Sequence, residues 1–202
     1  MEPKHDFDIY NASVESFDGT TKTELGLNNE VLWSLEDRIL IFEGTDEGKV
    51  FQIKSSYVGK SSGEFQKVEG IGTQGAGTSL MQTVAVYPYD DNLSLGVDND
   101  EKPVVSSICF PLEQAYTENS FANGSFPMTA VAPYGDNSLY FKNVGGVLKL
   151  NLTGEYAVSK ITLTGKSDEP LAGNAEVTIG DGGIPYVEMS REASKSVSLV
   201  CD

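Results

Sequence analysis

Apolar and polar residues alternate with a period of two along much of this chain. Such alternation is typical of a β-strand with one buried face. Ala175, Val177 and Ile179, for example, alternate with Glu176 and Thr178. Further strands are predicted at residues 7–14, 38–42, 50–54, 80–87, 104–110, 148–153, 160–164 and 196–201. Because Gly, Asn, Asp and Ser turns separate strand-sized runs, the pattern predicts an all-β sandwich of mostly antiparallel strands.

Helical periodicity is almost absent, and one short turn is expected from Ser34 to Asp37. Residues 59–78 are rich in Gly, Ser and Gln, which favours a wide hairpin or a loop. Trp33 is flanked by leucines and is expected to be a buried core anchor. The two cysteines, Cys109 and Cys201, are too few for a disulfide framework, and we expect small apolar side chains that face a core.

The chain has 202 residues, of which 14 are Lys or Arg and 30 are Asp or Glu, so its formal net charge is −16. A field of this sign repels phosphate, which argues against nucleic-acid binding and against adhesion to anionic lipid. No apolar run reaches the roughly 18 residues of a membrane span, so no membrane insertion by this chain is expected. We interpret residues 1–6 as a disordered or engineered start and 7–202 as one β-sandwich domain.

Candidate catalytic chemistry is sparse. The single histidine, His5, lies near the start of the chain, which removes most Ser-His, Cys-His and His-metal arrangements. The acidic segment 90–101 does not have the ligand spacing of a known calcium loop. A glycosidase with two carboxylates stays open as an alternative, because 30 acids supply many pairs and the sequence singles out none. No enzymatic activity, cofactor or metal is therefore predicted.

Several segments together resemble the fimbrillin-like proteins of Bacteroidales. Residues 31–39 are similar to a signature of that family in which a Trp precedes a short turn, an acidic residue and a strand. Residues 86–89 resemble the Tyr-Pro-Tyr strand end, and residues 110–114 the Pro-x-x-Gln segment. The most specific match is 141–150, followed in order by Leu152-Thr153-Gly154, Ile161-Thr162-Leu163 and Leu171-Ala172-Gly173.

This resemblance implies a transthyretin-like β-sandwich that forms the N-terminal domain of a longer, two-domain surface protein. It further implies export as a lipoprotein to the outer membrane, with the signal removed, and a structural or adhesive role at the cell surface as a subunit of a pilus, or fimbrium. The partners would be other pilus subunits. The alternative is a surface module that does not polymerise and binds a glycan or a host protein.

Subunits of this family assemble by exchanging strands, after a protease cuts the loop that follows the first strand. The resemblance makes residues 7–14 the exchangeable strand, with Phe7, Ile9, Tyr10, Ala12 and Val14 as its apolar positions. It makes Lys22, in Thr21-Lys22-Thr23, the candidate cleavage position, although relatives often have arginine there. A solvated loop lysine is the alternative interpretation of Lys22.

Overall fold

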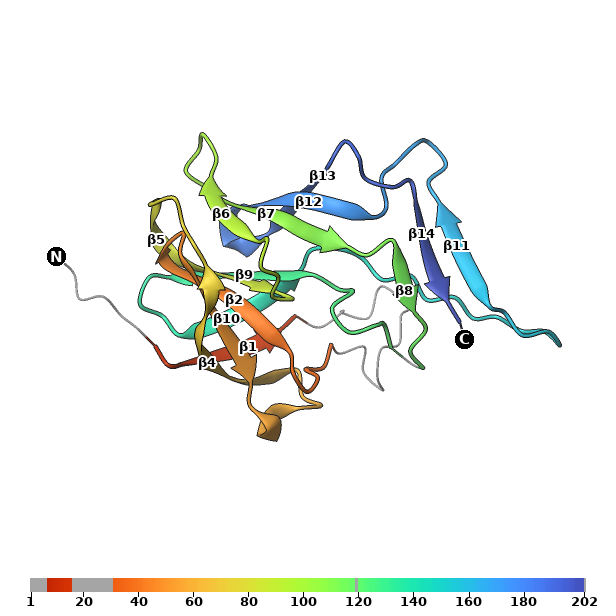
Figure 1. Ribbon diagram of the computed structural model, residues 1–202, viewed down its shortest axis with the longest axis horizontal. Helices are drawn as coiled ribbons and strands as arrows, with labels where there is room; N and C mark the ends of the chain where they lie inside the picture. The colour runs from red at the N-terminus through yellow and green to blue at the C-terminus, as the bar shows by residue number, and fades with distance from the viewer. Residues whose placement is uncertain (1–6, 16–30, 119, 202) are drawn as a thin grey trace.

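The computed structural model describes residues 7–15, 31–118 and 120–201 (Figure 1). It confirms an all-β chain with almost no helix, because helical structure in these ranges is limited to the 3₁₀ turns η1 (Ser55–Tyr57) and η2 (Asp181–Gly183). The strands of the described ranges are β1 (Ile9–Val14), β2 (Arg38–Thr45), β3 (Gly48–Ile53), β4 (Ser62–Thr73), β5 (Ser79–Tyr87), β6 (Ser94–Val97), β7 (Pro103–Phe110), β8 (Glu113–Ala115), β9 (Met128–Pro133), β10 (Ser138–Asn143), β11 (Lys160–Thr164), β12 (Gly173–Ile179), β13 (Pro185–Met189) and β14 (Ser196–Val200).

Seven of these strands form a closed sheet in the order β1-β10-β9-β5-β2-β3-β4. The sheet closes through β1, which pairs antiparallel with β4 and parallel with β10. The other neighbours in this sheet are antiparallel. Its interior is filled by aromatic and aliphatic side chains, among them the fully buried Phe65 and Phe141.

A second sheet, in the order β13-β12-β7-β6, lies on the outside of the closed sheet. The two layers share a separate apolar core, which includes Leu40 and Phe42 of β2 together with Val177 of β12. On β2, Ile39 and Ile41 point instead into the closed sheet. Strand β2 is buried on both faces, which explains why apolar residues run continuously from 39 to 42.

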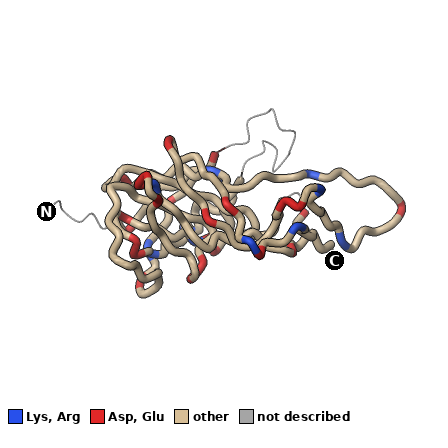
Figure 2. Tube along the Cα trace, turned by 90° about the horizontal axis from the view of Figure 1, so that it is seen from above, with Lys and Arg blue, Asp and Glu red and all other residues tan. Residues whose placement is uncertain are grey.

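The third sheet, β11-β14-β8, adjoins the segment between β10 and β11, residues 144–159, which extends away from the rest of the trace and returns to it (Figures 1 and 2). Here the predicted strand 148–153 is wrong, because these residues belong to no strand and Leu148 is 63% exposed. The alternation indicates an extended segment with one apolar side, but a strand also needs a hydrogen-bonded neighbour. The described part of this chain offers none at residues 148–153.

Of the two alternatives predicted for residues 59–78, a wide hairpin or a loop, the loop is largely wrong, since β4 extends to Thr73 and pairs antiparallel with the preceding strand β3 and with β1. One of the glycines that suggested a loop is needed for close backbone approach. A Cβ at Gly72 would lie 2.2 Å from the carbonyl oxygen of Gly48 on β3. Glycine within a strand often marks such an approach.

Cys109 is exposed and Cys201 is half-buried, and both are free thiols, so the prediction that they face a core is wrong. In β7, Val105 is buried, and strict alternation would turn residue 109 inward as well. The register with β12 shifts here: Val105 and Ile108 lie three residues apart on β7, but their partners Val177 and Ala175 lie only two residues apart on β12. Ser107, within this stretch, has a φ of 68°. This β-bulge reverses the alternation and turns Cys109 outward.

Candidate functional site

Strand β1 fills a slot between β4 and β10, and we use "the β1 slot" for that position. Its register runs from Ile9 opposite Gln66 to Ser13 opposite Ser62 on β4, and from Asn11 opposite Ser138 onward on β10. Neither neighbour follows β1 directly in the chain, so neither forms a hairpin with it. Strand β1 is therefore held by pairing and packing with segments that are distant in sequence.

Three of the five apolar positions proposed for this strand point into the closed sheet: Tyr10, Ala12 and Val14 are all buried. The Tyr10 ring packs edge-on against Phe51, with 5.0 Å between the ring centroids. Phe7 precedes the strand and is partly buried against the same core, 5.5 Å from Tyr10. Ile9 is half-exposed and alternates onto the outer face. The slot is thus occupied by a large, a small and a branched side chain in succession.

Backbone contacts continue beyond both ends of β1. The amide of Lys67 on β4 donates to the carbonyl of Asp8 at 2.9 Å. At the other end, the amide of Glu15 donates to the carbonyl of Phe141 at 2.9 Å, and the Glu15 carboxylate accepts from the amide of Asn143 at 2.6 Å. Strand β1 is therefore an integral part of the closed sheet in this structure.

Trp33 lies beneath the β1 slot and joins its two sides. Its ring packs edge-on against Phe65 of β4, at 4.9 Å, and against Phe141 of β10, at 5.7 Å. It is 1% exposed, which confirms the predicted core anchor. Its backbone is held by Lys60 and Gly59, whose carbonyl and amide pair with Trp33 at 3.0 and 2.8 Å. The two strands that border β1 are thus linked by packing that does not involve β1.

The expected turn from Ser34 to Asp37 is confirmed and holds Trp33 in place. The amide of Ser34 donates to the Asp37 carboxylate at 2.7 Å, and the amide of Asp37 donates to the Ser34 carbonyl at 3.2 Å. The hydroxyl of Tyr87 donates to the other Asp37 oxygen at 3.0 Å. Burial raises the pKa of Asp37, although the hydrogen bonds from Ser34, Tyr87 and Asn123 act in the opposite direction. Both carboxylate oxygens are engaged in holding the turn.

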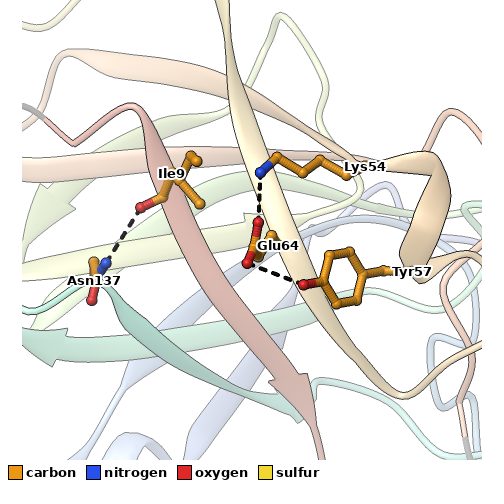
Figure 3. A network of polar contacts seen from close by, with 5 residues as sticks. All are labelled: Ile9, Lys54, Tyr57, Glu64 and Asn137. Atoms are coloured by element: carbon orange, nitrogen blue, oxygen red, sulfur yellow. Dashed lines mark hydrogen bonds and ion pairs between the residues drawn. The ribbon is translucent and has the colours of Figure 1, made fainter.

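The outer face of β1 forms the floor of a shallow depression of about 310 Å³, which β4, β10 and the η1 turn surround. On its rim, the Glu64 carboxylate of β4 accepts hydrogen bonds from Lys54, at 2.5 Å, and from the hydroxyl of Tyr57, at 3.0 Å (Figure 3). These two donors hold the pKa of Glu64 below its ordinary value. Also in Figure 3, the side-chain amide of Asn137 reaches the Ile9 carbonyl at 3.5 Å.

Sequence reasoning did not identify this outer depression. Its polar members, such as Glu64 and Ser138, lie at ordinary solvent-side positions of strands, which carry no distinguishing signal. They become neighbours only because β1 joins β4 to β10. Lys22, the candidate cleavage position, lies outside the described residues.

Charged groups elsewhere perform structural tasks. Burial would raise the pKa of Asp46, but backbone amides of Thr78, Ala76 and Gly77 donate to its carboxylate and hold the pKa below its ordinary value. These bonds fix the loop between β4 and β5. Within the described ranges, no group of three or more His, Cys, Asp or Glu residues is arranged to hold a metal ion.

No family model, no curated protein and no solved structure matches this chain. In the part of the chain that the structure describes, no helix has the length and apolar character to cross a membrane. The features that bear on function are therefore the sequence resemblance and the geometry of the β1 slot.

Proposed function

We propose that this chain is a structural or adhesive cell-surface protein, a fimbrillin-type pilus subunit that assembles by exchange of its first strand. The closed sheet and the sheet packed on it would together be the transthyretin-like β-sandwich of such a subunit. The protein would act at the cell surface, exported as a lipoprotein to the outer membrane. Its partners would be further subunits of the same pilus.

The observation that carries this proposal is the position of β1. It is the first strand of the described chain, it closes the sheet, and it forms no hairpin with either neighbour. A strand that forms no hairpin with its neighbours can leave without pulling either of them with it. Its departure would expose unpaired backbone groups on β4 and β10, together with the pockets of Tyr10, Ala12 and Val14.

An incoming strand would pair with the exposed backbone groups and fill the empty side-chain pockets, as in β-strand addition to an open sheet edge. The packing of Trp33 against Phe65 and Phe141 supports the proposal further, because it links the two sides of the slot without help from β1. The slot would then keep its width while it is empty. The surface charge is consistent with this role, because a net charge of −16 limits accidental pairing between sheet edges.

Limited proteolysis of the folded chain tests the proposal. Trypsin is added, the new N-terminus is sequenced, and the products are separated by size exclusion and weighed by mass spectrometry. We expect cleavage at Lys22, loss of the peptide that contains β1, and the appearance of oligomers. The matched control is the Lys22→Gln variant, which should stay monomeric with β1 in place. Retention of the β1 peptide on a monomeric body after cleavage at Lys22 would count against strand exchange.

A further inference from the structure

The depression over the outer face of β1 combines groups that suit a small polar ligand. Asn11 and Ser13 of β1 form its floor, Ser138 and Tyr140 come from β10, and Glu64 comes from β4. In the described structure, the side chains of Asn11 and Ser13 have no hydrogen-bond partner. The depression therefore offers an amide and a hydroxyl that are not used by the fold.

Glu64 adds a fixed acceptor to this surface. Its two oxygens are oriented by Lys54 and by the Tyr57 hydroxyl, and these two donors also hold the pKa of Glu64 below its ordinary value (Figure 3). The adjacent Lys54 ammonium compensates the carboxylate charge locally. A neutral ligand suits such a site better than an ion, and the net charge of −16 further disfavours an anion.

The Tyr140 ring supplies the exposed apolar part of the depression, because the Tyr57 ring is partly buried against the core of the closed sheet. Tyr140 is 53% exposed on β10, and Tyr57 stands on the other side of β1, next to β4. Lys60 lies over the Tyr57 ring, with its ammonium nitrogen 5.0 Å from the ring centroid. An exposed ring beside hydroxyl, amide and carboxylate groups matches a pyranose, which has an apolar C–H face and a rim of hydroxyls.

We propose that the depression over β1 binds a neutral saccharide of one or two rings. The volume of about 310 Å³ lies at the lower end of the range for small-molecule sites. Because the depression is shallow and leaves much of a ligand in water, a dissociation constant on the order of 1 mM is expected. This inference is independent of strand exchange, since the depression is present in the chain as it stands.

Ligand-observed NMR on the full chain tests the inference with three probes, maltose, cellobiose and N,N′-diacetylchitobiose. At least one probe should bind saturably, and Tyr140→Ala should weaken that binding about tenfold or more. The matched control is Tyr156→Ala, because Tyr156 is 91% exposed and lies outside the depression. That variant should bind within about twofold of the unsubstituted chain.

A second variant, Asn11→Ala, provides the same test if the Tyr140 variant does not fold, because Asn11 is exposed and its side chain has no partner in the described structure. It should weaken binding about threefold or more. Absence of saturable binding by all three probes up to about 20 mM would overturn the inference, since that limit lies well above the expected constant. Binding that survives both depression variants, or that is lost equally in Tyr156→Ala, would overturn it as well.

Discussion

The Tyr10→Ala substitution measures how firmly β1 is built into the closed sheet. Tyr10 is fully buried, and its ring packs edge-on against Phe51 and Phe7 at centroid distances of 5.0 and 5.5 Å. Replacing a buried aromatic residue by alanine costs about 3–5 kcal/mol of unfolding free energy, because transfer energy and packing are both lost. The same burial fixes β1 between its two neighbours, so the cost reports directly on retention of the strand.

For a chain of this size, each kcal/mol lowers the midpoint of thermal unfolding by about 2–4 °C, so the lower estimate of about 3 kcal/mol corresponds to roughly 6–12 °C. The midpoint can be followed by circular dichroism, and urea titration gives the free energy directly. The matched control is Tyr140→Ala on the adjacent strand, because Tyr140 is 53% exposed and faces outward. That control should change stability by no more than about 0.5 kcal/mol. A Tyr10→Ala loss below about 1 kcal/mol would refute the assignment of β1 to the core.

Three further predictions concern other parts of the molecule. Burial raises the folded-state pKa of Asp37, so the folded state binds this proton more tightly than the unfolded state does. The free energy of unfolding of the natural chain, relative to that of Asp37→Asn, should therefore fall as the pH rises from the unfolded-state pKa through the raised one. Urea titrations across that pH range check this prediction, and a relative free energy that rises with pH would contradict it. Gly72→Ala should lower the free energy of unfolding by about 1–3 kcal/mol, because the added Cβ would lie 2.2 Å from the Gly48 carbonyl oxygen. In the same urea titration, Gly146→Ala should leave the stability nearly unchanged, because a Cβ at Gly146 would meet nothing within 4 Å. If strand exchange and saccharide binding both occur, a saturating saccharide should slow the loss of the β1 peptide after trypsin cleavage, because β1 forms the floor of the depression. An unchanged rate of peptide loss in the presence of a probe that binds would refute this coupling between saccharide binding and strand release.

The sequence alone was sufficient for the strands that carry a regular apolar pattern. Residues 38–42 and 175–179 were placed correctly, as was the turn from Ser34 to Asp37, because each is specified by its own side chains and their immediate neighbours. Burial of Trp33 also followed from its apolar flanks. Local preference and tertiary contact agree at these positions, which is the condition under which a pattern is informative.

The candidate site depended on tertiary structure to a greater degree. The alternation at residues 7–14 indicates that Tyr10, Ala12 and Val14 share one face, but it does not indicate that β4 and β10 lie on either side. Nor does it place Trp33 against both of those strands. These contacts join segments that are far apart in the chain, so no local pattern contains them.

Where the sequence misled, pairing between distant strands decided the outcome. The leucines at 148–152 have the period of a strand but no neighbour to pair with, and the glycine-rich residues 62–73 form a strand because β3 and β1 border them. Cys109 faces outward because one extra residue bulges opposite β12. A sequence records which side chains can share a face, whereas backbone hydrogen bonding across the sheet determines whether that face exists and which way it points.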